Sequence, residues 1–368
     1  MAGALDGVKV IDLSRILAGP FASQTLGDMG ATVLKIEHPN GDDTRRWGPP
    51  FVTRDDGSVD AAYFFCCNRN KTSVCIDFTR DDDRAQLVEL IKTADVLIEN
   101  YKVGSLAKYQ LDYNSLGPLN PGLIYCSITG FGQTGPYKER PGYDALIQGM
   151  GGLMSITGEE NGPPQKVGVA VVDLMTGLYA STAILAALRH RDKTGEGQHI
   201  DLALFDVQAA MLANQAATYL MSGQVPTRKG SAHPSIAPYQ PLKVKDGYIM
   251  LAVGNDKQFK SLCEAANCSQ LANDERFSTN PARVQNRQAL ENQLTEHMRL
   301  KTIDEWIALG EQHRFPCGPI NSIDRVFKDK QLCSRNMIVG EEIKMVANPI
   351  KLSETPIQNY RTPPLLKK

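Results

Sequence analysis

The sequence lacks the motifs that mark metal centres, hydrolases and disulfide-rich scaffolds. Its eight cysteines form no C-x-x-C pair, and no cysteine or histidine cluster has the spacing of a zinc site. No serine lies in a G-x-S-x-G motif and no H-E-x-x-H motif is present, so neither a serine hydrolase nor a metal-dependent hydrolase is indicated. We therefore expect no bound metal, and the sparse cysteines favour a reducing compartment.

The sequence also lacks an excess of one charge and a long apolar run. Its 40 basic and 41 acidic residues give a net charge of −1, whereas nucleic-acid proteins normally carry a basic excess. The longest apolar stretches, such as Leu146–Met154, contain Gly and Gln and fall short of the ~20 residues that a membrane span requires. Folded-looking sequence begins at Leu5–Leu13, so we expect no signal or transit peptide in this chain. The expected partners include neither nucleic acid nor a membrane.

What the N-terminal half does contain is a regular alternation of short apolar strands and amphipathic helices. The expected strands are Val8–Leu13, Thr32–Ile36, Ser73–Phe78, Val96–Ile98, Leu123–Ile128 and Gln198–Leu204. The expected helices are Pro20–Met29, Arg80–Thr93 and Leu174–Arg189. Strands that alternate with helices of this size predict an α/β fold with a mostly parallel sheet.

The character of the chain changes at Met221–Pro238, where Gly, Pro, Ser and Lys cluster as in a linker. Beyond it, Asp246-Gly247 is typical of a hairpin turn before a strand at Tyr248–Val253. Helices then dominate, and the last of them opens with a capping box at Thr302 and Glu305. The three expected helices are Asp256–Ala266, Asn286–Arg299 and Thr302–His313.

A glycine-rich segment, Gly130–Gly135, fits the G-x-G-x-x-G pattern and follows an expected strand. A dinucleotide fingerprint also requires a helix that starts within the glycines and an acidic residue about 20 positions later. Pro136 follows the segment directly, and no such acidic strand end appears. We interpret the segment as a flexible turn that can approach a ligand, and a nicotinamide oxidoreductase has no other support.

Asp173 lies where an apolar, extended run from Val167 meets the helix expected from Leu174. One interpretation is a helix N-cap, because aspartate is among the best capping residues. The other is a carboxylate nucleophile at the mouth of a sheet, where α/β folds place their ligands. The two roles are compatible, since a helix start also offers backbone N–H groups to developing negative charge.

Cations are scattered near the expected strand ends. Most are solvated surface residues, but some could hold phosphates or a substrate carboxylate, which arginine binds with two hydrogen bonds. Trp47 could stack on a ring or an acyl chain, or simply form part of a surface turn. The cations are Arg15, Lys35, Arg45, Arg46, Arg69, Lys71, Lys102, Lys108, Lys138 and Arg140.

Several segments, taken in order, resemble class III CoA-transferases over nearly the whole chain. They are Leu5–Leu13, Ala18–Pro20, Leu26–Glu37, Asp95–Asn100, Thr129–Pro136, Arg140–Asp144, Lys193–Gln198 and Pro316–Ile320. The resemblance implies a Rossmann-like large domain of residues 1–220 completed by 325–368, a linker of 221–240 and a smaller α+β domain of 241–324. It also implies that two chains interlock as an obligate homodimer.

The resemblance assigns the nucleophile to Asp173 and coenzyme A contacts to several strand-end positions. The contacts are Ile16, Ala18, His38, Ile76, Asn100, Lys108, Arg140 and Tyr143. An arginine that is often found near the CoA phosphates aligns with His38. Gly230–Pro234 replaces a glycine-rich loop of the formyl and oxalyl branch, so formate and oxalate are not expected as substrates.

The similarity is greatest to the branch of the family that acts on glutarate. It implies succinyl-CoA as donor, a free dicarboxylic acid as acceptor, no permanently bound cofactor and a mitochondrial location. A distal carboxylate needs a cationic partner, and the candidates are Arg45, Arg46, Arg69 and His233. The implied mechanism forms an anhydride and then a CoA thioester on Asp173, so it needs neither ATP nor metal.

Two other functions are compatible with the resemblance to this family and remain open. A racemase of α-methylacyl-CoA needs two acid/base groups, and that branch supplies one from a Gly-His-Asp motif. The corresponding triplet here is Gly142-Tyr143-Asp144, which favours the transferase because tyrosine is a poor base near neutral pH. The other alternative is a CoA-binding protein without catalytic activity, which the presence of Asp173 disfavours.

Overall fold

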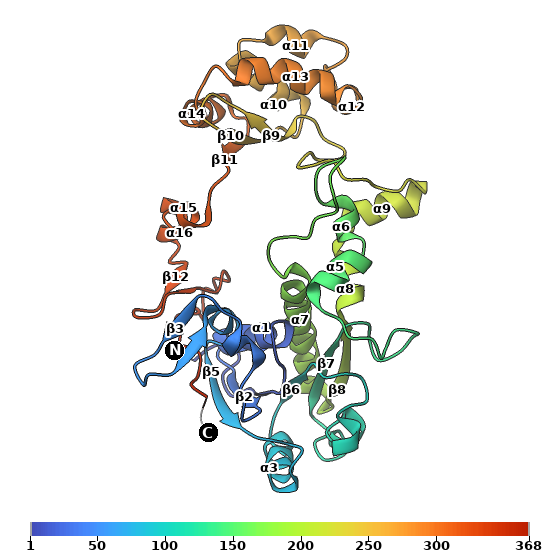
Figure 1. The fold of residues 1–368 in the computed structure, drawn as a ribbon, viewed down its shortest axis with the longest axis vertical. Helices are drawn as coiled ribbons and strands as arrows, with labels where there is room; N and C mark the ends of the chain where they lie inside the picture. The colour runs from blue at the N-terminus through green and yellow to red at the C-terminus, as the bar shows by residue number, and fades with distance from the viewer. Residues whose placement is uncertain (1, 367–368) are drawn as a thin grey trace. The chain divides into compact units, whose positions relative to one another are not determined.

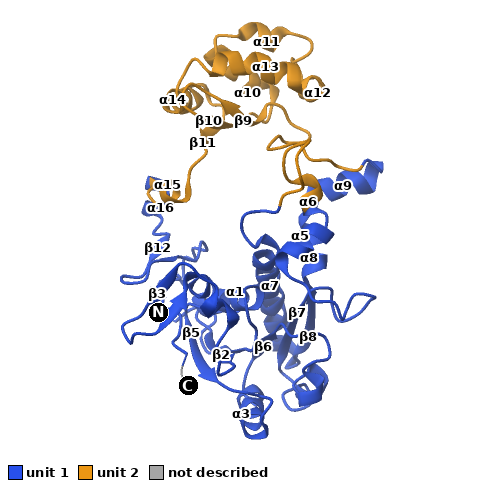
Figure 2. Ribbon diagram, viewed as in Figure 1, with its two compact units in different colours: residues 1–153, 166–224, 330–368 blue, residues 154–165, 225–329 orange. Residues whose placement is uncertain are grey.

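The computed structural model describes residues 2–366, which form two compact units (Figure 2). The larger unit consists of the chain up to residue 153, residues 166–224 and the chain from residue 330 onward. The smaller unit consists of residues 154–165 and 225–329. The sequence contained no signal that residues 154–165 leave the larger unit, because this segment is as polar and glycine-rich as an ordinary loop.

The larger unit is built on a parallel sheet of six strands, as the alternating pattern predicted. Counted along the chain within this sheet, the strands lie in the order 3-2-1-4-5-6, which is the order of Rossmann-like folds. The order reverses between β1 and β6, where Val10 is paired with Val33 on one side and Val96 on the other. In order across the sheet, the strands are β5 (Lys71–Cys75), β2 (Thr32–Glu37), β1 (Lys9–Asp12), β6 (Val96–Glu99), β7 (Ile124–Thr129) and β8 (Gln198–Ala203).

Helices cover both faces of this sheet (Figure 1). Along β1, Val10 belongs to the apolar core under α1 (Ala18–Asp28) and α7 (Val171–Thr194). The next residue, Ile11, belongs to the core under α3 (Asp81–Lys92) on the opposite face. Because successive side chains of a strand point to opposite faces, a strand buried on both sides carries consecutive apolar residues, as Val10 and Ile11 show at the centre of β1.

By length and composition alone, α7 is long and apolar enough to cross a membrane. Gly177 and several polar residues interrupt the apolar run of α7, so its sequence does not stand out as a membrane span. Core helices of globular domains have the same character, and α7 packs on α1 with Ala180 and Ile184 fully buried. We therefore interpret α7 as the central core helix of the larger unit.

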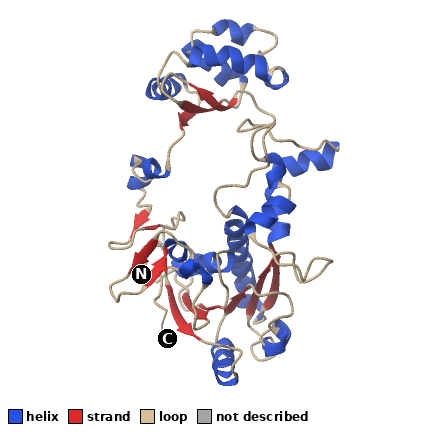
Figure 3. Cartoon of the chain, viewed as in Figure 1, coloured by secondary structure: helices blue, strands red, loops and turns tan. Residues whose placement is uncertain are grey.

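Short elements around the sheet complete the larger unit (Figure 3). The C-terminal segment runs beside β5, where the Arg361 N–H donates to Asn70 Oδ1 at 2.7 Å. The short elements are η1 (Asp43–Arg46), β3 (Phe51–Thr53), β4 (Val59–Ala61), α2 (Ala62–Phe65), η2 (Ala107–Tyr109), α4 (Tyr113–Leu116), α5 (Asp144–Met150), α8 (Leu204–Met211), α9 (Ala213–Ser222), α16 (Lys330–Ser334), β12 (Ile338–Val339) and β13 (Met345–Val346).

The smaller unit combines an antiparallel sheet of three strands with helices. The hairpin predicted at Asp246-Gly247 is confirmed, since it joins two antiparallel strands. The capping box of Thr302 and Glu305 is also confirmed. The elements are α6 (Leu153–Ile156), β9 (Tyr239–Lys243), β10 (Tyr248–Ala252), α10 (Asp256–Ala265), α11 (Ser269–Asn273), α12 (Asn280–Gln285), α13 (Arg287–Met298), α14 (Ile303–His313), β11 (Cys317–Pro319) and α15 (Ile323–Val326).

Candidate active site

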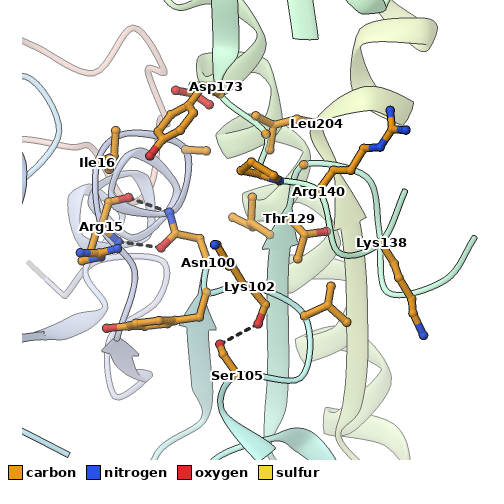
Figure 4. A pocket seen from close by; sticks show the side chains of 18 of the residues that line it. Arg15, Ile16, Asn100, Lys102, Ser105, Thr129, Lys138, Arg140, Asp173 and Leu204 are labelled. Atoms are coloured by element: carbon orange, nitrogen blue, oxygen red, sulfur yellow. Dashed lines mark hydrogen bonds between the residues drawn. The ribbon is translucent and has the colours of Figure 1, made fainter. Parts of the chain in front are cut away.

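A cavity of about 360 Å³ lies at the carboxyl ends of β1 and β6. This is where the strand order reverses, and α/β sheets bind their ligands at such a point. Figure 4 shows Asp173 at one end of the cavity, with Ile16 and Asn100 along one side and Arg140 along the other.

The loop that follows β1 forms one wall of the cavity. Ile16 adopts a φ of +73°, a left-handed conformation that is unusual for a β-branched residue. The side chain of Asn100 ties this loop to the end of β6: its Oδ1 accepts the Arg15 N–H at 2.8 Å, and its Nδ2 donates to the Arg15 carbonyl at 2.7 Å (Figure 4). The two strands at the reversal point are thus joined at the cavity.

Asp173 lies in the first turn of α7, which begins at Val171 and has Ala170 as its N-cap. The expected N-cap role of Asp173 and the expected extended run before it are therefore wrong. The capping acceptor is Asp144, at the start of α5. Its Oδ1 accepts the backbone N–H of Val172 at 2.8 Å and that of Asp173 at 3.3 Å. The Asp173 carboxylate is thereby left free to face the cavity.

The environment makes the Asp173 carboxylate unusually basic. Burial, with a smaller contribution from the nearby Asp144 charge, raises the pKa of Asp173 to about 7. A poorly hydrated carboxylate of this basicity is a stronger nucleophile than an exposed aspartate, although only its ionised fraction can react.

An aromatic pair from the η1–α2 region lies within electrostatic reach of the nucleophile. Burial, with smaller contributions from Cys66 and Asp173, raises the pKa of the Tyr63 phenol, so this side chain lies within electrostatic reach of Asp173. The Tyr63 ring meets that of Trp47 edge to face, with centroids 5.3 Å apart. Tyr63 was not predicted, because it sits in the apolar run Ala61–Cys67, which reads as ordinary core.

Six of the expected site residues line this one cavity: Ile16, Ala18, Asn100, Arg140, Tyr143 and Asp173. The other three expected coenzyme A contacts lie outside its lining. His38 follows β2 and Ile76 follows β5, so both lie at the same edge of the sheet as the cavity. The third, Lys108, lies in η2 with its Nζ 4.6 Å from the centre of the Tyr109 ring.

Two of the cations expected to hold a substrate carboxylate are used inside the fold instead. Arg45 is buried between Glu37, at 2.7 Å, and Asp60, at 3.0 Å. Arg69 is buried against Asp28 at 2.6 Å. These partners are far away in sequence, so local pattern could not reveal them. The expectation that either arginine holds the substrate carboxylate is therefore wrong, because both guanidinium groups are already paired inside the fold.

The other two candidates remain available for substrate. Arg46 exposes 57% of its side chain and is paired with Asp43 at 3.1 Å. His233 belongs to the smaller unit, where its ring contacts Tyr239 at a centroid distance of 5.3 Å.

Further cations lie in the cavity wall and suit a phosphorylated ligand. Lys102 follows β6, and Lys138 and Arg140 belong to the loop after β7 (Figure 4). The Arg140 guanidinium lies 3.9 Å from the centre of the Tyr137 ring, which orients it. Lysine and arginine are the usual partners of phosphate oxygens.

The glycine-rich segment after β7 is the predicted turn. No helix begins within it, since α5 starts only at Asp144, so the pyrophosphate-binding fingerprint is absent. Gly130 instead allows another backbone to come close: a Cβ at Gly142 would lie 2.3 Å from the Gly130 Cα. A nicotinamide oxidoreductase therefore loses its only support.

A comparison with known families decides the assignment. Residues 5–368 match the model of CoA-transferase family III. The chain belongs to this family. The resemblance noted from the sequence motifs is thus confirmed, and the protein is a CoA-transferase.

Individual relatives of this CoA-transferase are similar over nearly its whole length. The succinate–glutarate CoA-transferase of Agrobacterium fabrum is 51% identical over 98% of this chain and 92% of that protein. The human succinyl-CoA:glutarate CoA-transferase is 42% identical over 98% of this chain and 83% of that protein. The crystal structure of a CAIB/BAIF family protein from Brucella suis is 51% identical, covers 100% of this chain and 97% of that one, and superposes with a TM-score of 0.91.

Proposed function

We propose that this CoA-transferase moves coenzyme A from succinyl-CoA to glutarate through a covalent intermediate on Asp173. The observation that carries the proposal is the basic, half-buried carboxylate of Asp173 at the end of a cavity whose wall also contains cations. Two relatives that are named as succinate–glutarate or succinyl-CoA:glutarate CoA-transferases, at 51% and 42% identity, support the choice of substrates.

In the proposed first half-reaction, an Asp173 carboxylate oxygen attacks the succinyl-CoA carbonyl. The C–S bond breaks, CoA leaves as a thiolate, and a mixed anhydride of Asp173 and succinate remains. The thiolate then attacks the aspartyl carbonyl of the anhydride. This step forms an aspartyl-CoA thioester and releases succinate as its carboxylate.

In the second half-reaction, a glutarate carboxylate attacks the aspartyl thioester and expels the CoA thiolate. The thiolate then attacks the glutaryl carbonyl of the new anhydride, which yields glutaryl-CoA and regenerates the Asp173 carboxylate. One thioester replaces another, so the overall reaction is nearly isoenergetic. Covalent catalysis and positioning can therefore supply the lowering of the barrier.

The wall opposite the cations can assist the anhydride steps. Leu17 and Ala18 line the cavity at the start of α1. Among the described residues, no hydrogen-bond acceptor is assigned to the backbone N–H of either. Free N–H groups at a helix start suit the negative oxygen that develops on an attacked carbonyl.

For the acceptor, we propose Arg46 of the larger unit as the partner of the distal glutarate carboxylate, with His233 of the smaller unit as the alternative. Arg46 precedes Trp47, whose ring contacts Tyr63 near the nucleophile. The remaining coenzyme A contacts that we propose, His38, Ile76 and Lys108, rest on the family resemblance. The interlocked homodimer and the mitochondrial location rest on it too and stay predictions.

The proposal is tested by incubating the full chain with succinyl-CoA and glutarate and separating the CoA esters by liquid chromatography. We expect glutaryl-CoA to appear at the rate at which succinyl-CoA disappears, and Asp173→Asn to abolish the exchange. A parallel incubation of 2-methylacyl-CoA in D₂O separates the alternatives. Deuterium at the α carbon without CoA exchange would indicate a racemase, and binding without either reaction would indicate a non-catalytic protein.

A further inference from the structure

A buried network of charges lies behind the loop that follows β1. It contains four cations and four carboxylates, and two of its lysines are almost inaccessible: Lys35 is 0% exposed and Lys71 is 3% exposed. The members are Lys35, Lys71, Arg45, Arg54, Asp12, Glu37, Asp42 and Asp60. None of the reaction steps proposed above uses these groups.

Lys35 lies at the point where this network meets the loop. Its Nζ is 2.9 Å from Asp42 Oδ2 and donates to the Ser14 carbonyl at 2.9 Å. Asp42 in turn accepts the backbone N–H of Ile16, at 3.3 Å from its Oδ2. The Lys35–Asp42 ion pair therefore holds the loop by hydrogen bonds on both sides of Arg15, at Ser14 and at Ile16.

A second lysine holds the helix that continues from the loop. Lys71 Nζ donates to Asp12 Oδ2 at 2.9 Å and to the Pro20 carbonyl, in the first turn of α1, at 2.8 Å. Asp12 also accepts the Ser14 N–H at 3.1 Å. The loop is thus fixed at its beginning, its middle and its end.

The loop needs such support because of Ile16. A left-handed conformation is strained for any residue with a Cβ, and a β-branched side chain adds to the strain. A gain in folding stability does not explain a buried ion pair, because well-packed apolar residues in its place often make a protein equally stable or more stable. An ion pair that contacts a strained loop can instead select one backbone conformation of that loop over the others.

We propose that Lys35 is a positioning residue for CoA transfer: its ion pair with Asp42 holds Ile16 in the left-handed conformation. This conformation fixes Leu17–Ala18 in the wall of the cavity, where the reacting carbonyl is bound. The inference rests on the proposed role of Asp173.

The charge state of Lys35 is consistent with this role. Burial alone would lower the pKa of Lys35, but the surrounding carboxylates of Asp42, Asp12 and Glu37 outweigh burial and raise it. The ammonium group is therefore charged throughout the pH range in which the enzyme can work.

The test compares Lys35→Met in two backgrounds. In the wild-type chain, the substitution should lower kcat for CoA transfer by about tenfold or more, because small misplacements of catalytic groups cost this much. In an Ile16→Gly chain, Lys35→Met should lower kcat by less than about threefold, because glycine adopts a positive φ without strain and no longer needs the ion pair. The effects of the two substitutions on kcat should therefore not be additive. Arg69→Met, which breaks another buried ion pair of the larger unit, is the matched control, and its effect should be the same in both backgrounds.

Hydrogen exchange of a peptide spanning residues 13–21 gives a readout that does not depend on turnover. Lys35→Met should speed hydrogen exchange in this peptide. If Lys35→Met does not fold, Asp42→Asn takes its place, because it removes the other half of the ion pair and should also speed exchange. Equal losses of kcat in both backgrounds, or unchanged exchange in a folded variant, would overturn the proposal. Faster exchange in a protein whose wild type transfers no CoA would instead refute the proposed function, while still showing that Lys35 holds the loop in its conformation.

Discussion

Gly177 lies directly against the carbonyl oxygen of Ala18. A Cβ atom at position 177 would be 2.8 Å from that oxygen and 3.1 Å from the Phe21 ring. Position 177 is one turn of α7 beyond Asp173, and Ala18 is the first residue of α1. This contact therefore sets how closely the nucleophile approaches the opposite wall of the cavity.

Gly177→Ala should push the starts of α1 and α7 apart. Overpacking of this kind typically costs about 1–3 kcal/mol, which the better helix propensity of alanine offsets in part. We expect a lower free energy of unfolding in denaturant titrations together with a several-fold lower kcat. Gly318→Ala is the control, since no atom lies within 4 Å of its Cβ position. Unchanged kcat in Gly177→Ala would show that the spacing of the helices does not matter for transfer.

The pH dependence of the reaction should report the basic carboxylate of Asp173. Only the ionised form attacks a thioester, so kcat/KM should rise with pH and level off above the pKa of about 7. Asp144→Asn removes the negative charge that adds to this shift, so it should move the midpoint to lower pH. A profile that is flat from pH 5 to pH 8 would mean that Asp173 is an ordinary, solvated carboxylate.

The same pKa shift predicts a penalty in stability. Because the folded-state pKa of Asp173 is raised above its unfolded value of 3.8, the folded protein binds an extra proton, and stability falls as the pH rises from about 4 to about 7. Asp173→Asn lacks this penalty, so it should be more stable than the wild type at pH 8, by an amount on the order of 1–3 kcal/mol. The gain in unfolding free energy of Asp173→Asn over the wild type should be much smaller at pH 4. An equal gain at pH 4 and pH 8 would contradict the raised pKa of Asp173. Glu99, whose pKa burial also raises to about 7, is present in both proteins and cancels in the comparison.

The choice of acceptor should depend on a distal carboxylate clamp. Loss of a partner for a buried charge costs about 2–5 kcal/mol, so pentanoate should react at least about 30-fold less efficiently than glutarate. The measurement is kcat/KM for the two acids with succinyl-CoA as donor. Arg46→Ala or His233→Ala should narrow the gap by slowing glutarate alone, with Arg69→Ala as a control for lost stability. Equal values for the two acids in the wild type would show that no clamp exists.

Local sequence patterns predicted the parallel sheet well, because most of its strands are short, mainly apolar runs that alternate with helices. Asp173 was also found, since a helix start leaves a recognisable boundary. The start of α7 was misjudged by three residues, at Leu174 instead of Val171, because Asp144, which caps the helix, is 29 positions away from Asp173. The same limit applies to Arg45 and Arg69, whose partners come from other strands and helices. Such long-range pairs depend on the tertiary fold, and local periodicity contains no information about them.

The most direct test of covalent catalysis by Asp173 is the intact mass of the protein during turnover. After succinyl-CoA is added without an acceptor, we expect a fraction of the chain to gain the mass of CoA less one water, the mark of an aspartyl-CoA thioester. Hydroxylamine should remove this adduct, peptide mapping should place the resulting hydroxamate at Asp173, and Asp173→Asn should show neither adduct nor transfer. If Asp173→Asn keeps most of the wild-type kcat, or the adduct maps to another residue, Asp173 is not the nucleophile.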